Sequence, residues 1–323
     1  MRRVFCSLLI VVCTCLSLYG GFSVEDTKLL DGNGEPFIFR GVDVPHAWFR
    51  KSTKRVLNDV SATGANGVRL VLANGELWEK TSRRELKKLL KWCRERELIA
   101  IIEIHDTTGY GDKEGAATID TAVRYWLEMQ DVLKGTEDYV VLNIANEPLG
   151  NENPESLWAE IHIEAIRQLR EAGFTHTLMV DMPNWGQDWQ RHGPKHAMEI
   201  FKSDPLANTV FSVHMYDVFS NEEKVKSYIE SMVDQKLCLV IGEFAQTHFG
   251  MPIAAEAIMK WAQHYGIGYL GWSWCGNSGE LVDLDIVKGF KNPELTPWGE
   301  LLVDGPNGIR ATSRKATVFT GQD

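Results

Sequence analysis

Short, strongly apolar runs recur along the chain and alternate with longer segments whose apolar residues are three to four positions apart. A continuous apolar run of about four to eight residues is typical of a strand buried on both faces. A spacing of three to four is typical of an amphipathic helix with one face on a core. Strands are therefore expected at residues 37–42, 67–72, 98–105, 139–145, 177–181, 209–214, 237–242 and 268–274.

The helical pattern fills most of the gaps between these runs. Strands that alternate with helices in this way are parallel and are joined by right-handed crossovers. Eight such units predict an α/β fold with a single domain, the closed (β/α)8 TIM barrel. A doubly wound open sheet is the alternative, but it usually has fewer strands, and no GxGxxG or Walker A motif follows the first run. The clearest helical segments are residues 83–96, 118–133, 157–171, 222–234 and 253–264.

The N-terminal segment differs from the rest of the chain. Arg2 and Arg3 precede an apolar stretch over residues 4–18, and small residues follow it. This order is typical of a cleaved secretory signal, and the stretch is short for a membrane span, which needs about 20 apolar residues. We therefore expect a signal peptide at 1–23, the barrel at 24–323, and a secreted, extracellular protein that is not attached to a membrane after cleavage.

The net charge of the chain limits the classes of partner that it could bind. It has 34 basic and 44 acidic residues, a net charge of −10, and loss of the signal would remove two more arginines. So acidic a protein is a poor candidate for binding nucleic acid or an anionic membrane. A neutral polymer would be compatible with this charge, and we expect a monomer.

The cysteines predict neither a disulfide framework nor a metal site. Three of the six lie in the expected signal, which leaves Cys93, Cys238 and Cys275. The number is odd and no pair has C-x-x-C spacing, so no zinc site or redox motif is indicated. Cys238 begins one expected strand and Cys275 follows another, which places them at opposite ends of the barrel, beyond the roughly 7 Å Cα separation that a bridge allows. All three are expected to be free thiols.

Two glutamates carry most of the information about function. Glu147 closes one strongly apolar run, and Glu243 closes another. Barrel enzymes place their catalytic groups at the C-terminal ends of the strands. Two carboxyl groups on two such strands suggest the acid/base and the nucleophile of a glycosidase. Either one alone could instead be a strand-end acid paired with a buried arginine or a helix terminus.

Polar and aromatic residues end the other strands and would share the same face. Flat aromatic rings at a wet cleft suit the apolar faces of sugar rings. Arg69 and the Tyr216 hydroxyl are candidates to keep Glu243 ionised, because a cation and a hydrogen bond both favour the carboxylate. Each histidine, taken singly, could be an ordinary core residue. The candidate substrate-binding residues are Arg69, His105, Asn146, Trp185, His214, Tyr216, Trp272 and Trp274.

Four motifs connect these residues to a known family. Asn-Glu-Pro, His-Met-Tyr, Gly-Glu-Phe and Trp-Ser-Trp occur in this order at the expected fourth, sixth, seventh and eighth strands. The chain thereby resembles glycoside hydrolase family 5, and most closely its bacterial-type β-mannanase subfamily. The resemblance implies a retaining endo-β-1,4-mannanase that uses no metal or cofactor and hydrolyses mannan, glucomannan and galactomannan. It implies Glu147 as acid/base and Glu243 as nucleophile, with Trp272 or Trp274 as the stacking platform.

Three other functions remain open at this stage. An endo-β-1,4-glucanase of the same family would differ only in the sugar hydroxyl that it recognises. A sugar-binding barrel without catalysis has no need for two opposed acids. A phosphate-handling barrel enzyme would have glycine-rich loops after the seventh and eighth strands, and Gly276-Asn-Ser-Gly279 is only a weak match.

Overall fold

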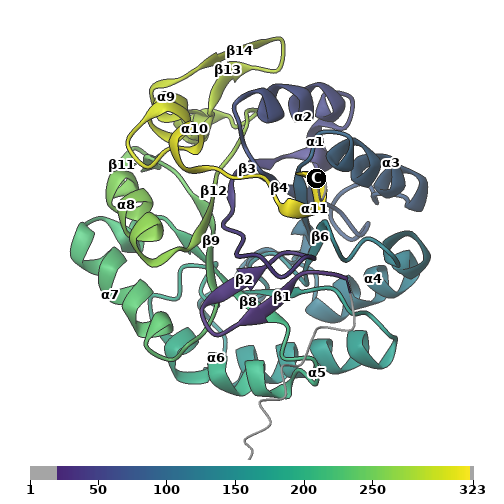
Figure 1. Ribbon diagram of the computed structural model, residues 1–323. Coiled ribbons are helices and arrows are strands. Elements are labelled where there is room, and N and C mark those ends of the chain that lie inside the picture. Colours follow the sequence, from purple (N-terminus) through teal and green to yellow (C-terminus); the bar gives the residue numbers. More distant parts are fainter. Residues whose placement is uncertain (1–19, 321–323) are drawn as a thin grey trace, which may run out of the picture.

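The computed structural model describes residues 20–320, and eight parallel strands in it close into a barrel in the order β12-β3-β4-β5-β6-β7-β8-β9. Helices surround the barrel (Figure 1), so the predicted (β/α)8 fold is confirmed. The barrel strands are β3 (Arg40–Val44), β4 (Gly67–Leu72), β5 (Ile99–Ile104), β6 (Val140–Asn143), β7 (Leu178–Asp181), β8 (Thr209–Met215), β9 (Leu239–Phe244) and β12 (Gly268–Gly271). The longer helices are α2 (Thr53–Ala62), α3 (Arg83–Arg94), α4 (Ile119–Leu133), α5 (Leu157–Glu171), α6 (His192–Ser203), α7 (Glu222–Val233), α8 (Ala255–Tyr265) and α9 (Pro297–Asp304).

Each expected strand overlaps one strand of the barrel. The run at 67–72 forms β4 over its whole length. All six of its residues are buried, as expected for a strand that lies between a core and a layer of helices. The last strand differs from the expectation. β12 ends at Gly271, so residues 272–274 lie beyond the sheet, and this changes where the two tryptophans of that motif point.

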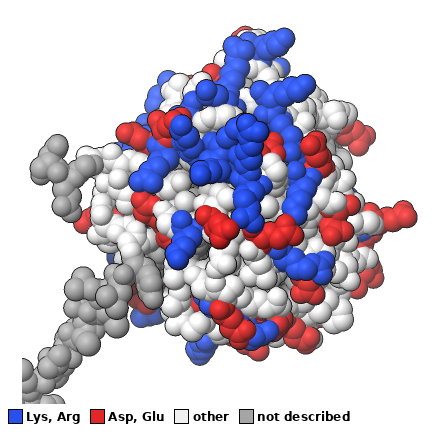
Figure 2. Space-filling view, turned by 90° about the vertical axis from the view of Figure 1, so that its right-hand side faces the viewer, with Lys and Arg blue, Asp and Glu red and all other residues white. Residues whose placement is uncertain are grey.

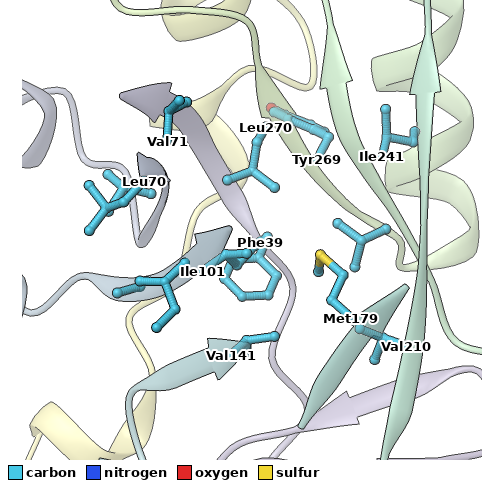
Figure 3. Packing of buried hydrophobic residues seen from close by; sticks show 14 of the residues in the cluster. Phe39, Leu70, Val71, Ile101, Val141, Met179, Val210, Ile241, Tyr269 and Leu270 are labelled. Atoms are coloured by element: carbon cyan, nitrogen blue, oxygen red, sulfur yellow. The ribbon is translucent and has the colours of Figure 1, made fainter. Parts of the chain in front are cut away.

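Aromatic rings fill the end of the barrel at which the strands begin. Phe39 packs edge-on against Phe37 with ring centroids 4.9 Å apart, and Phe37 packs in the same way against Phe22 at 5.4 Å. Figure 3 shows Phe39 within the apolar cluster that the barrel strands enclose. The short hairpin of β1 (Ser23–Glu25) and β2 (Lys28–Leu30) crosses this end (Figure 1). The opposite end is left free for polar chemistry.

The folded part begins before the expected signal boundary. The boundary after Ser23 falls inside β1, and most of the expected signal lies outside the described residues. Phe22 is buried, its N–H donates to the Glu137 carbonyl at 2.9 Å, and its carbonyl accepts a bond from Asn208 at 2.9 Å. Cleavage after Ser23 would remove this anchor. Residue 22 thus belongs to the folded part of the chain, and the position at which a signal would be cleaved remains an expectation.

The expectation of free thiols is confirmed, because Cys93, Cys238 and Cys275 are unpaired and buried. Burial raises the pKa of each thiol to about 12. A thiol is nucleophilic only as the thiolate, so we predict that a thiol reagent at neutral pH labels the folded protein very slowly. The denatured, unreduced protein should titrate three thiols beyond any in the N-terminal segment. A count of one would contradict the assignment.

The negative net charge is not spread evenly over the surface. Six of the twelve residues of α3 are lysine or arginine, and all six are exposed. Figure 2 shows that basic side chains gather on the face of the molecule that carries this helix. Three of them pair with acids: Arg83 with Asp131 of α4 at 2.7 Å, Lys91 with Glu95 at 3.7 Å and Arg94 with Asp138 at 3.9 Å. Within residues 20–320, no helix is both long and apolar enough to cross a membrane.

Candidate active site

A cavity of about 440 Å³ opens at the C-terminal ends of the strands and holds both glutamates. A larger hollow of about 600 Å³ lies outside the barrel, beside α7 and α8, and contains none of the expected site residues. We place the site in the smaller cavity because strand ends, not helix flanks, carry the chemistry of this fold. Six of the expected residues line it: His105, Glu147, Trp185, Tyr216, Glu243 and Trp272.

Glu243 lies in β9 and is held by one bond on each oxygen. Oε1 accepts from Arg69 Nη1 at 2.8 Å, and Oε2 accepts from the Tyr216 hydroxyl at 2.8 Å. Burial raises the pKa of Glu243 to about 7, while Arg69 and the bond from Tyr216 act against that rise. Two fixed donors on a buried carboxylate favour its charged form. Glu243 is therefore prepared to act as an anion.

Glu147 follows β6 and has different partners. Its Oε1 lies 2.7 Å from His214 Nδ1, and its backbone N–H donates to Asp181 Oδ2 at 3.1 Å. Burial raises the pKa of Glu147 well above its usual value, and the negative charges of Glu243 and Asp181 raise it further. No arginine contacts its carboxyl group among the described residues. When the two glutamates share one proton, that proton belongs on Glu147, as a general acid requires.

The two carboxyl groups face each other across a short gap. One side-chain oxygen of Glu147 and one of Glu243 lie within 4.8 Å of each other, and His214 Nδ1 lies within the same radius of both. This spacing would also suit a metal ion. However, His214 Nδ1 already bonds to Glu147, and both oxygens of Glu243 already accept hydrogen bonds. Hydrogen bonding therefore accounts for the cluster without a cation.

A buried layer of charge lies beneath the cavity, and sequence reasoning missed most of it. Besides Glu243, Arg69 Nη1 lies 3.2 Å from Asp43 and 3.8 Å from Glu103, and Nη2 lies 3.2 Å from Asp181. Burial raises the pKa of Asp43, Glu103 and Asp181, and the positive charge of Arg69 acts against that rise. These three acids could have been predicted from sequence, because each lies inside an apolar strand and acids are rarely buried there unless they are paired.

Three expected substrate ligands belong to this layer and do not line the cavity. Arg69, Asn146 and His214 are completely buried. The Asn146 amide oxygen accepts from Arg69 at 2.5 Å, and its nitrogen donates to the Thr108 hydroxyl at 2.8 Å. Asn146 therefore positions Arg69, which in turn positions Glu243.

The expected tryptophans separate into two groups. Trp272 lines the cavity and stacks on His105, with ring centroids 5.6 Å apart and planes 20° apart. Trp185 lines it too, and its indole N–H donates to Asp112 at 2.9 Å. Trp274 is fully buried and does not line the cavity. The expected place of Trp274 beside Trp272 in the cavity is not what the structure shows, because the strand ends at Gly271 and its alternation of faces does not continue through residues 272–274.

The cavity also contains residues that the sequence did not indicate. They come from loops, where no apolar run marks a position in advance. Gln187 follows β7, His248 and Phe249 follow β9, and Leu281 and Leu284 belong to the short helix η3 (Gly279–Leu284). These residues are Gln187, His248, Phe249, Leu281 and Leu284.

Comparison with known proteins identifies the family. The family profile described as cellulase (glycosyl hydrolase family 5) matches residues 30–278. The chain belongs to glycosyl hydrolase family 5. The resemblance noted from its motifs is thereby confirmed.

Several family 5 relatives of high similarity to this chain carry the name of a β-mannanase or mannan endo-1,4-beta-mannosidase. A mannan endo-1,4-beta-mannosidase of Cellvibrio japonicus is 51% identical over 306 residues, which cover 95% of this chain and 71% of the relative. One of Streptomyces lividans is 45% identical over 303 residues, covering 94% and 78%. The structure of a mannotriose complex of Thermomonospora fusca β-mannanase has a TM-score of 0.89 and 45% identity, and the match covers 93% of this chain and 99% of that one.

Proposed function

We propose that this family 5 enzyme is a retaining endo-β-1,4-mannanase, with Glu147 as acid/base and Glu243 as nucleophile. The observation that carries the mechanism is the facing pair of glutamates, within 4.8 Å at their nearest ligand atoms, in two unlike environments. Retaining glycosidases hold their carboxyl groups about 5–5.5 Å apart, whereas inverting ones need about 6.5–9.5 Å to admit a water. The short gap supports retention.

In the first step, Glu243 attacks the anomeric carbon while Glu147 protonates the leaving oxygen. The Glu243 carboxylate forms the new carbon–oxygen bond, and the sugar–oxygen bond to the leaving chain breaks as it takes the proton from Glu147. Arg69 and Tyr216 hold Glu243 in line for this attack. His214 holds the carboxyl group of Glu147 from the other side.

In the second step, the roles of the two residues reverse. Glu147, now a carboxylate, takes a proton from water, and the water oxygen attacks the same anomeric carbon and displaces Glu243. Two inversions at one carbon give net retention. Loss of the proton in the first step is what makes Glu147 a base, so its raised pKa serves both steps.

The Tyr216 hydroxyl should set the acidic limb of the pH profile. Glu243 must be ionised, so kcat/KM falls as the pH decreases through its pKa, which the bond from Tyr216 lowers. Because a hydrogen bond to a charged group contributes about 1.5–3 kcal/mol, Tyr216→Phe should shift this limb upward by about one pH unit or more. The profile of kcat/KM on a mannooligosaccharide measures it, and an unmoved acidic limb would refute the assigned contact.

The substrate is β-1,4-linked mannan, supported by the similarity of the whole barrel to proteins named as mannanases. The catalytic pair does not distinguish mannan from cellulose, and the family profile carries the name cellulase, so endoglucanase is the second candidate. We expect release of reducing sugar from glucomannan and galactomannan, and little from carboxymethylcellulose or xylan. Similar kcat/KM on mannohexaose and cellohexaose would favour the second candidate.

Secretion and a monomeric state complete the proposal. The basic and apolar start of the sequence supports a cleaved signal, and the burial of Phe22 supports a cleavage site before it. Sequencing of the secreted protein from its N-terminus should begin at or before residue 22. Sedimentation at micromolar concentration should give the mass of one chain.

A further inference from the structure

A tight hairpin after β9 forms one side of the cavity. Strands β10 (Thr247–His248) and β11 (Met251–Pro252) pair antiparallel and leave Phe249 and Gly250 as the turn. Both turn residues have positive φ, 47° at Phe249 and 74° at Gly250. Positive φ at both central residues defines a type I′ turn.

Phe249 is an unfavourable residue for this turn. The first central position of a type I′ turn favours asparagine, aspartate or glycine, and a bulky side chain at positive φ is an outlier. Burial does not compensate for the strain, because 56% of Phe249 is exposed. A strained residue that gains little packing in return points to a function for its side chain.

The surroundings of the hairpin hold this ring at the cavity. Phe249 lines the cavity that contains both catalytic glutamates. His248 fixes the base of the turn, because its Nδ1 lies 2.9 Å from Asp217 Oδ2 and its ring stacks on Tyr216 at a centroid distance of 4.7 Å. The ring of Phe249 lies 4.4 Å from that of His248. The exposed ring is therefore not free to swing with a loose loop.

We propose that Phe249 is a sugar-binding platform whose exposed face stacks on a mannosyl residue bound next to the residue that is cleaved. This rests on the proposed function and adds a subsite to it. Trp272, beyond β12, already offers an aromatic face beside the catalytic pair. Phe249 reaches the same cavity from a different loop, so the two rings can contact two successive sugars. Aromatic rings bind the apolar faces of sugars in this way.

Phe249→Asn separates binding from folding, because asparagine is favoured in this turn but offers no stacking face. We expect it to raise the Tm by about 2 °C or more and to lower kcat/KM on mannohexaose roughly tenfold. It should leave kcat/KM on 2,4-dinitrophenyl β-mannoside, which has one sugar ring, within about twofold of wild type. Phe249→Tyr should retain most of the activity on mannohexaose. Met251→Ala is the matched control, because Met251 is 53% exposed on the same hairpin but does not line the cavity.

Three results would contradict the proposal that Phe249 is a sugar-binding platform. Unchanged kcat/KM on mannohexaose would show that no sugar stacks on the ring. An equal loss on the one-ring substrate would show that Phe249 acts through His248 and Tyr216 on the nucleophile. A lowered Tm would show that the ring supports the fold. If the wild-type enzyme cleaves cellohexaose and not mannohexaose, the proposed function fails by itself. The kcat/KM of Phe249→Asn relative to wild type is then measured on cellohexaose.

Discussion

Glu243→Gln is expected to lower kcat on mannan by at least about 10⁴-fold, because the first covalent bond cannot form without a carboxylate. That loss corresponds to about 5.5 kcal/mol of activation free energy. The fold should persist, since glutamine has nearly the same shape and can still accept from Arg69, whose bond to Glu243 measures 2.8 Å. Steady-state release of reducing sugar from galactomannan measures the effect.

Two controls make this result interpretable. The Tm of the Glu243→Gln variant should stay within a few degrees of wild type, which excludes unfolding as the cause. Glu222→Gln removes an acid that lies outside the active-site cavity, on the surface of α7, and should leave kcat unchanged. Activity of Glu243→Gln within tenfold of wild type would contradict its role as nucleophile.

Glu147→Gln is expected to lower kcat on mannan by about 10³-fold, because a sugar alkoxide leaves slowly without a proton donor. The variant should still form the covalent intermediate rapidly from a 2,4-dinitrophenyl glycoside, whose leaving group needs no proton. Its second step should be slow, because the base that activates water is missing. Stopped-flow release of dinitrophenol should therefore show a burst followed by slow turnover.

Azide supplies the decisive control for Glu147. A small anion needs no general base, so it should restore turnover of the dinitrophenyl substrate and give a β-glycosyl azide. Wild type should gain nothing from azide. A variant that shows no burst and no rescue would place the acid/base elsewhere.

The sequence predicted the barrel because the patterning of a parallel sheet is strong. Strands such as Gly67–Leu72 are apolar on both faces, and few other structures produce such runs at regular spacing. At the N-terminus, the sequence alone did not show that Phe22 is buried in the fold, because in sequence it looks like part of a signal. Its role in closing the barrel depends on contacts with Glu137 and Asn208, which are more than 100 positions away.

The sequence indicated the cavity residues that lie at strand ends, but it did not indicate those that come from loops. The sequence indicated that Glu147 and Glu243 would lie at one mouth because each closes an apolar run, and both line the same cavity. Asp43 and Asp181 were missed because their importance arises from a shared neighbour, Arg69, which only the closed barrel supplies. The place of Phe249 in the cavity lining was not predicted, because nothing in a loop sequence gives the φ angle that makes it unusual.

The most direct test of the account is to trap the covalent intermediate. A 2-deoxy-2-fluoro-β-mannosyl fluoride, alone or extended by one mannosyl residue, should inactivate the enzyme and add one glycosyl mass per chain. The fluorine at C2 slows both steps, but the good fluoride leaving group keeps the first step fast enough for the covalent intermediate to accumulate. Proteolysis and mass spectrometry should place the added mass on Glu243. An unlabelled protein under conditions of full inactivation, or a label on Glu147 or any other residue, would contradict the double-displacement mechanism proposed for this site.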